Sequence, residues 1–180
     1  RRESGPLPLG LQVADIAGGS LHAVIGILAA VVQRQASGRG QMVDISMTDC
    51  AFALNAMAGA AALAGGVDAQ PEATLLNGGS FYDYYQTADD RYLAVGSLEP
   101  QFMQALAQAI DQPQIAGLGL AQDAATQAQL KQTLRDTLRE KTLAEWQTIF
   151  AGVDACVEPV LSLSEAAAQP HAHARNWVVQ

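Results

Sequence analysis

Two acidic residues, Asp15 and Glu99, stand where the sequence predicts the start of a helix. Asp15 lies just before a Gly-Gly-Ser step at 18–20, and Glu99 is followed by Pro100, which suits a first helical position. The N-terminus of a helix carries free N–H groups and partial positive charge, and it can stabilise a developing negative charge. Two rigidly held carboxylates can serve as proton donor and proton acceptor. On the residues alone, an ordinary helix-start acid is the commoner explanation of each.

The element after Asp15 is predicted to be a long helix. Apolar residues recur at helical spacing over residues 21–35, so this helix should begin at residues 18–20 and bury one face. Gly26 inside it either permits close packing of a neighbour or is a tolerated small residue, and the sequence leaves both readings open. Glycines at positions 38 and 40 should end the helix in a left-handed turn.

A strand and a second helix are predicted next. Residues 41–46 alternate and are β-branched, which favours a short strand. Ser46 to Asp49 resembles a capping box that opens a helix running through an alanine-rich stretch to Gly65 and Gly66. Helix, glycine turn and strand in this order indicate an α/β fold. The polar stretch 66–79 is expected to be a linker.

Residues 81–87 and 91–96 are predicted to form a hairpin, which leads directly to Glu99. Its alternation assigns two aromatic pairs to opposite faces: Tyr82 with Tyr84, and Phe81 with Tyr85. Helices should follow over 102–110 and 124–141, and a capping box at Thr142 should open another. A strand at 156–160 would be cut short or kept at an edge by Pro159.

The C-terminal stretch should hold one last short helix, starting at Ser162 and ended by Pro170. His171 and His173 are expected in a polar turn beyond it. They lack a convincing third ligand, so no metal site is predicted.

Composition excludes several classes of function. Hydrophobic residues make up 49% of the 180 residues and charged residues 16%, which suffices for a core and argues against disorder. The net charge of −8 argues against nucleic acid as the main partner. Two cysteines without metal-site spacing suit a reducing compartment, and the apolar stretch 51–64 is too short to span a bilayer. The expectation is a cytoplasmic protein with no membrane partner.

Two long blocks then resemble one family. The first is QVADIAGGSLHAVIGILAAVVQRQASGRGQMVDISMTD, and the second is LLNGGSFYDYYQTADDRYLAVGSLEPQF. Together with the tail CVEPVLSLSEAAAQPHAHAR they resemble the superfamily of family III CoA-transferases and α-methylacyl-CoA racemases (CaiB/BaiF-like), the racemase branch in particular. The resemblance covers nearly the whole chain.

The resemblance implies a role for each acid. Asp15 matches the family's catalytic aspartate, which is a nucleophile in transferases and an acid/base group in racemases. Glu99 matches the glutamate of racemases, where transferases tend to have a glycine-rich loop. Gly78 and Gly79 are implied to face the substrate. No cofactor is implied beyond the CoA moiety of an acyl-CoA substrate.

The resemblance also implies an architecture. Residues 1–76 would belong to a Rossmann-like large domain, residues 77–152 to a smaller α+β domain, and residues 153–180 to a segment returning to the large domain. Family members form interlocked homodimers. The family's catalytic histidine lies upstream of the aspartate and nothing here matches it, so the chain resembles a fragment without the N-terminal half that is poorly active or inactive alone.

Three functions follow as hypotheses. The first is inversion of the α-carbon of a 2-methylacyl-CoA through an enolate, by Asp15 and Glu99 acting from opposite faces. The second is CoA transfer between carboxylic acids, with Asp15 as nucleophile. The third belongs to another class, a fragment or binding remnant without catalysis.

Overall fold

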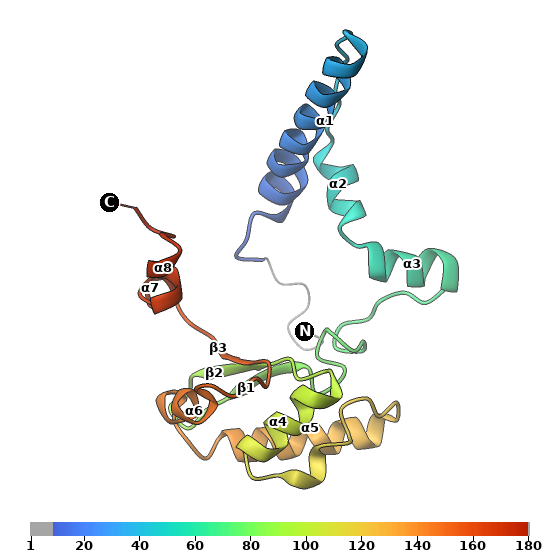
Figure 1. Cartoon of the computed structure of the whole chain (residues 1–180). Helices are drawn as coiled ribbons and strands as arrows, with labels where there is room; N and C mark the ends of the chain where they lie inside the picture. The colour runs from blue at the N-terminus through green and yellow to red at the C-terminus, as the bar shows by residue number, and fades with distance from the viewer. Residues whose placement is uncertain (1–8, 180) are drawn as a thin grey trace. The chain divides into compact units, whose positions relative to one another are not determined.

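The computed structural model describes residues 9–179, which divide between residues 70 and 71 into two compact units (Figure 1). The first unit contains a π-helix, η1 (Val13–Leu21), that runs directly into α1 (His22–Ser37), followed by α2 (Met47–Ala53) and α3 (Ala56–Gly65). Gly38 ends α1 with a left-handed backbone at φ 69°, and its N–H donates to the carbonyl of Arg34. The predicted glycine turn is confirmed.

The predicted start of the first helix is wrong. Helical structure begins at Val13, so the Gly-Gly-Ser step lies inside the helix rather than at its opening. The Ser20 hydroxyl donates to the Asp15 carbonyl at 3.0 Å, and the His22 ring bonds to the Ala17 carbonyl at 2.7 Å. Both side chains satisfy a carbonyl five residues earlier, at the point where the wide π-turns change to α-helix.

Glycines allow the rest of this unit to approach the helix closely. A Cβ at Gly18 would lie 3.2 Å from the Met47 carbonyl oxygen, and one at Gly26 would lie 2.8 Å from Cγ1 of Val43. Of the two readings of Gly26, the structure therefore supports close packing.

Two further predictions for the first unit are wrong. Residues 41–46 are not a strand, because no described segment of this unit supplies the neighbouring strand that its backbone would need. The second helix breaks after Ala53, and α2 and α3 meet at 77°. A third prediction, that the first helix buries one face, is not met within the described residues: none of α1 is buried, and Leu28 and Val32 are 60% and 67% exposed.

The stretch Val13–Ser37 is also long and apolar enough to cross a membrane by length and composition, with a mean hydropathy of 1.8. The bent pair of α2 and α3 passes the same test taken together. Core helices of soluble proteins pass it as well, so this finding assigns no membrane role.

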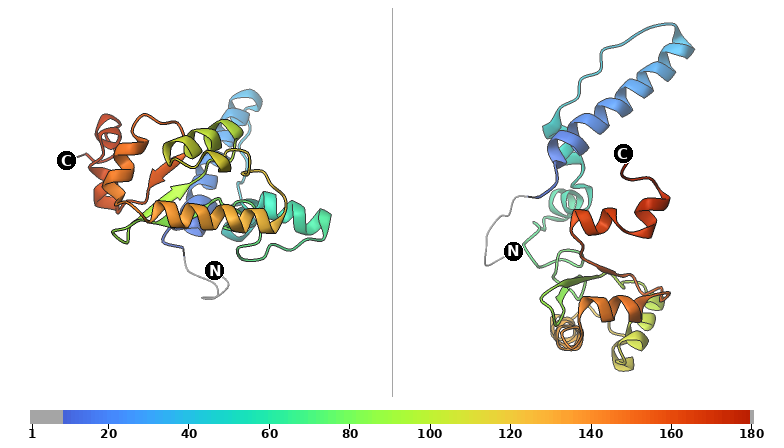
Figure 2. Two further views of the ribbon diagram at one scale, coloured as in Figure 1. Left: turned by 90° about the horizontal axis from the view of Figure 1, so that it is seen from below. Right: turned by 90° about the vertical axis from the view of Figure 1, so that its left-hand side faces the viewer.

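The second unit is built on a three-stranded antiparallel sheet in the order β1 (Asp83–Gln86), β2 (Tyr92–Val95), β3 (Val157–Pro159). Its helices are α4 (Pro100–Ala109), α5 (Ala124–Leu138), α6 (Leu143–Phe150), α7 (Leu163–Ala167) and α8 (Pro170–Ala174), with a 3₁₀ turn, η2 (Pro113–Ile115). Figure 2 shows α4, α5 and α6 gathered against one side of the sheet. The predicted hairpin, the predicted edge strand and the mixed helix-and-sheet class are confirmed.

The core of this unit lies between the sheet and those helices. Phe81 and Tyr85 are 0% and 1% exposed, whereas Tyr82 and Tyr84 are 36% and 58% exposed, as the predicted alternation requires. The other fully buried large side chains come mainly from α4, α5 and α6: Met103, Leu106, Leu130, Leu134, Leu138 and Trp146.

One prediction at the end of this unit is wrong. Pro170 does not end a helix but begins α8, where its missing N–H costs nothing at the first helical position. His171 and His173 therefore lie on a short helix rather than in a polar turn.

Candidate active-site residues

Asp15 lies in the first turn of η1 and is exposed. Its carboxylate makes no hydrogen bond or ion pair with any residue that the structure describes, and η1 has no side-chain cap. The acid therefore caps no helix among the described residues. It is left available beside the positively polarised end of the helix.

Glu99 occupies the position just before α4, with an extended backbone (φ −73°, ψ 145°). Its carbonyl accepts the N–H groups of Phe102 and Met103, both at 3.0 Å, so its backbone caps the helix. Its side chain makes no capping bond and is exposed. Pro100 follows at the first helical position, as predicted, and the carboxylate is again left available for another partner.

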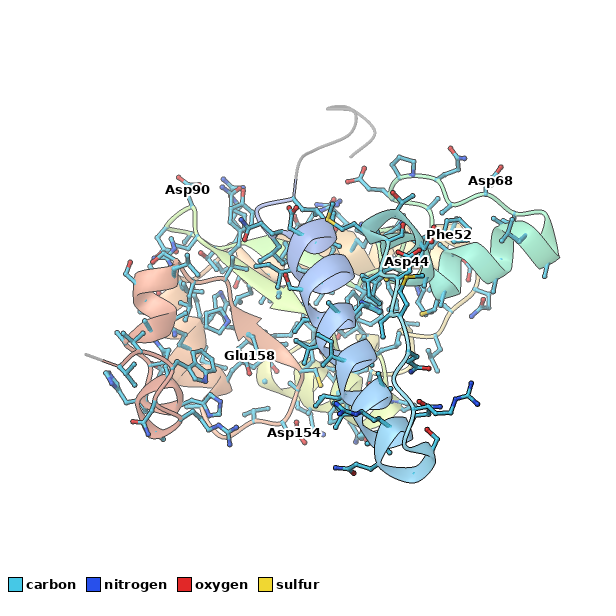
Figure 3. The ribbon with its side chains drawn as sticks, turned by 90° about the horizontal axis from the view of Figure 1, so that it is seen from above. Asp44, Phe52, Asp68, Asp90, Asp154 and Glu158 are labelled. Atoms are coloured by element: carbon cyan, nitrogen blue, oxygen red, sulfur yellow. The ribbon has the colours of Figure 1, made fainter. Side chains whose placement is uncertain are left out.

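Acidic groups lie near Cys156, an exposed residue just before β3. Although the residue as a whole is exposed, desolvation of its sulfur raises the pKa of the Cys156 thiol most, and the negative charges of Asp154, Glu99 and Glu158 raise it further. Asp154 and Glu158, two of these acids, are labelled in Figure 3. The negative charge of Glu99 thus contributes to the raised pKa of this thiol, a relation that no spacing in the sequence indicated.

Gly78 and Gly79 lie in a turn before β1. The Gly79 N–H donates to the Thr74 carbonyl at 3.0 Å, and Gly78 has a left-handed backbone at φ 88°. Lys131 of α5 donates to the Gly78 carbonyl and, at 2.9 Å, to Asp83. Local packing thus accounts for both glycines, and their implied contact with substrate stays a prediction.

Replacing Gly79 with alanine should destabilise the second unit. The new Cβ would lie 2.5–2.6 Å from backbone atoms of Ala73 and Thr74, which cannot rotate away as a side chain could. The expected loss in the free energy of unfolding is about 1–3 kcal/mol. Urea denaturation measures it, and Gly117→Ala is the control because nothing lies within 4 Å of a Cβ there. Equal stability of the two variants would contradict the packing argument.

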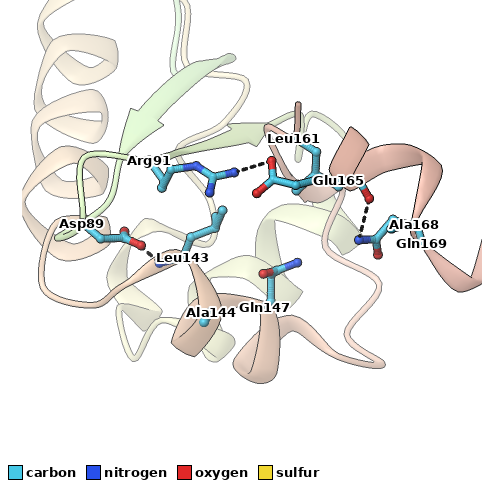
Figure 4. A pocket seen from close by; sticks show the side chains of 9 residues that line it. All are labelled: Asp89, Arg91, Leu143, Ala144, Gln147, Leu161, Glu165, Ala168 and Gln169. Carbon is cyan, nitrogen blue, oxygen red and sulfur yellow. Dashed lines mark hydrogen bonds and ion pairs between the residues drawn. The ribbon is translucent and has the colours of Figure 1, made fainter. Parts of the chain in front are cut away.

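A pocket of about 310 Å³ opens elsewhere on the second unit, lined by residues from the hairpin turn, α6 and α7 (Figure 4). Arg91 and Glu165 form an ion pair across it at 2.9 Å. Backbone and hydroxyl bonds from Ser162 and the hydrogen bond from Arg91 lower the pKa of Glu165 to about 2. Arg91 and Glu165, the charged groups that face each other in this pocket, are thus already paired with residues of the same chain.

The low pKa of Glu165 predicts a pH dependence. In an unfolded chain a glutamate titrates at about 4.3. The stability that its bonds contribute is therefore complete above that pH and is lost as the pH falls through about 2. A carbon-detected NMR titration should place the Glu165 midpoint near 2, and Arg91→Gln should move it upward. A midpoint that the Arg91 substitution leaves unchanged would contradict this explanation.

Several residues around the candidate site were missed in the sequence. Lys131 follows the buried Leu130 in α5. Its position next to the apolar row of that helix could have indicated that its side chain contacts another part of the unit. Ser97, which is 0% exposed, gave no signal because its partner, Ala155, is 58 residues away. Asp15 and Glu99 belong to different units, so their convergence on one substrate stays a prediction.

Comparison with known proteins gives the family. The sequence model described as CoA-transferase family III matches residues 1–180. The chain is 37% identical over 172 residues to α-methylacyl-CoA racemase of Homo sapiens, covering 91% of this chain and 43% of that protein. It is 52% identical over 42 residues to formyl-CoA:oxalate CoA-transferase of Streptomyces avermitilis, covering 23% of this chain and 10% of that protein.

Solved structures agree at the level of fold. A hypothetical protein from Mycobacterium tuberculosis superimposes with a TM-score of 0.74 at 22% identity, over 99% of this chain and 48% of that one. A CAIB/BAIF family protein from Brucella suis gives a TM-score of 0.67 over 94% of this chain and 46% of that one, also at 22% identity. The chain spans less than half the length of the curated relatives and structures that it matches most fully. Because the family match extends over every residue, this chain belongs to CoA-transferase family III.

Proposed function

We propose that this chain carries two acid/base groups of a protein that inverts the α-carbon of a 2-methylacyl-CoA. One carboxylate takes the α-proton from one face of the thioester, and the electron pair of the broken C–H bond moves into the thioester to form an enolate. An acid on the other face returns a proton to the same carbon. Asp15 and Glu99 take these two positions, and the substrate's composition is unchanged.

The observation that carries the proposal is the available carboxylate of Glu99, in a chain 37% identical to a racemase over nearly its whole length. A general base must have its oxygens free to reach a proton. Glu99 caps α4 with its backbone and leaves its side chain unbonded among the residues described, which suits that task.

The position of Asp15 supports a second part of the mechanism. The enolate carries negative charge on the thioester oxygen, and that charge needs hydrogen-bond donors aimed at it. The first turn of η1 offers N–H groups and the positive end of a helix beside Asp15. We therefore assign this helix end to binding the thioester oxygen.

We also propose that the rest of the protein and a second copy cover the first unit. Its exposed apolar side chains are numerous: Leu21, Val24, Ile25, Leu28, Val31 and Val32 on η1 and α1 are 47–67% exposed. Such a surface is covered in a folded protein or an assembly. A Rossmann-like large domain in a homodimer would cover it and would bury the Asp15 carboxylate.

CoA transfer is the second candidate function. The local 52% identity to a formyl-CoA:oxalate CoA-transferase favours it, because the matched relative is a transferase. Here the Asp15 carboxylate attacks the thioester carbonyl, CoA thiolate leaves, and an enzyme-bound anhydride forms. CoA thiolate then attacks the Asp15 carbonyl of the anhydride, which releases the first acid and leaves an Asp15–CoA thioester. The carboxylate of the second acid attacks that thioester, releasing CoA thiolate and forming a new anhydride. CoA thiolate finally attacks the acyl carbonyl of this anhydride, which gives the new acyl-CoA and restores the Asp15 carboxylate.

One experiment separates these functions. The whole protein is incubated in deuterated water with a 2-methylacyl-CoA of either configuration, with and without added free acid, and then with hydroxylamine. A racemase should place deuterium on the α-carbon without added acid and leave no modified Asp15. A transferase should yield a hydroxamate at Asp15 with or without the added acid, found by peptide mass spectrometry, and should form the CoA thioester of that acid only when the acid is present. If neither deuterium on the α-carbon nor a hydroxamate at Asp15 is found, the result supports the third reading, a chain without catalysis.

A further inference from the structure

Two contacts hold the segment that joins β2 to α4, the segment that carries Glu99. The Gly96 N–H donates to the Cys156 carbonyl at 2.9 Å, and the Ser97 hydroxyl donates to the Ala155 carbonyl. Ser97 and Ala155 are 0% and 1% exposed, so water does not compete for this second bond. The segment before Glu99 is therefore tied to the chain just before β3.

The backbone geometry of these contacts is unusual. In a regular strand, successive carbonyls point in opposite directions. Ala155 and Cys156 instead offer consecutive carbonyls to one segment, and Cys156 has a left-handed backbone at φ 49°, which is uncommon for a residue with a side chain. Leu98 closes the segment by donating its N–H to the Gly96 carbonyl at 2.7 Å.

We propose that Ser97 is a positioning residue for Glu99: its buried bond to Ala155 fixes the backbone from which the Glu99 carboxylate projects at the start of α4. Among the described residues, no other side chain bonds to residues 96–99. Glu99 is exposed and its side chain bonds to none of the described residues, so the backbone on either side sets the point from which the carboxylate projects. Pro100 and α4 hold one side, and Ser97 holds the other. The catalytic part of this inference rests on the proposed role of Glu99.

A purely structural role for Ser97 is the alternative. Removing its hydroxyl leaves the buried Ala155 carbonyl without a donor, which destabilises any protein. Both readings therefore predict a lower melting temperature for Ser97→Ala. Only the positioning role predicts that Ser97→Ala also lowers kcat and weakens the influence of the Glu99 charge on the Cys156 thiol.

The catalytic test uses the whole protein and the α-proton exchange assay. Ser97→Ala should lower kcat by roughly 10- to 100-fold with KM nearly unchanged, because a displacement of about 1 Å in a catalytic group can cost that much. Thr87→Val is the matched control. Thr87 is also 0% exposed and its hydroxyl donates to Asp89 at 2.6 Å, but it lies at the hairpin turn, at the other end of β2. The kcat of the Thr87→Val variant should match that of the unchanged protein.

A second test needs no catalysis and uses Cys156 as a reporter. Glu99 raises the pKa of this exposed thiol, so Glu99→Gln should speed its alkylation by iodoacetamide at neutral pH. The rate is followed on the Cys156 peptide by mass spectrometry. If Ser97 positions Glu99, the same substitution should have a smaller effect in the Ser97→Ala background. In the Thr87→Val background its effect should be unchanged.

The two tests separate failure of the inference from failure of the proposed function. If the unchanged protein exchanges no α-proton, the proposed function fails, yet the alkylation cycle still decides the role of Ser97. An equal effect of Glu99→Gln on the thiol with and without the Ser97 hydroxyl overturns the inference. A reduced effect supports it when Ser97→Ala leaves the alkylation rate unchanged in the Glu99→Gln background. A changed rate there means that the Ser97 bond acts on Cys156 through Ala155, and it overturns the inference.

Discussion

Replacing Glu99 with glutamine should abolish inversion of a 2-methylacyl-CoA while leaving the fold intact. General acid–base catalysis contributes about 10²–10⁴-fold, and a loss of that size is expected in the whole protein. The fold should survive because the carboxylate is exposed and bonds to none of the residues described. The measurement is the rate of interconversion of the two configurations by chiral chromatography of the released acids.

The two-base mechanism makes this result sharper. With Glu99→Gln, the remaining base can still remove and return a proton on its own face. In the Glu99→Gln variant, one configuration of the 2-methylacyl-CoA should therefore take up deuterium with retention, and the other should take up none. Asp15→Asn should show the opposite preference. The control is Glu140→Gln, an exposed acid at the end of α5, which should behave like the unchanged protein. Loss of exchange from the same configuration in both variants would contradict the assignment of one acid to each face.

Replacing Trp146 with alanine should have the largest effect on stability. Its side chain is 1% exposed, its ring lies 5.9 Å from that of Phe150, and its indole N–H donates to the Leu138 carbonyl at 2.8 Å. Truncation leaves a cavity and an unpaired buried carbonyl, so the expected loss is about 3–5 kcal/mol of unfolding free energy. Urea denaturation followed by circular dichroism measures it.

The chain supplies its own control for this prediction. Trp177 is 59% exposed and its main ring contact is the edge of His171 at 5.3 Å. Trp177→Ala should cost less than about 1 kcal/mol, since most surface changes are small. Similar losses in both variants would contradict the view that the stability of the second unit rests on the core beneath its sheet.

Much of the second unit follows from local sequence. Capping boxes at Thr142 and Ser162 open α6 and α7 as predicted, and Pro100 begins α4. Aromatic alternation orients β1 correctly. These signals succeed because each involves atoms within three or four residues of one another, so the sequence contains both partners of the interaction.

The first unit shows where local reasoning stops. Residues 41–46 have the pattern of a strand, yet a strand needs a neighbour to take its backbone hydrogen bonds, and no segment described in this unit provides one. Helical structure begins at Val13 rather than at residues 18–20, and within it the side chains of Ser20 and His22 bond to carbonyls five residues earlier. A propensity scale does not contain those bonds.

The sequence by itself determined the family, the two candidate acids and most helix boundaries of the second unit, because motifs and caps depend on residues near one another. Only the tertiary structure decided that Gly26 serves close packing against Val43. It alone joined Ser97 to Ala155 and brought Cys156 within the electrostatic influence of Glu99. Those contacts join residues more than fifteen positions apart, and their existence depends on how the chain folds back on itself rather than on any spacing along it.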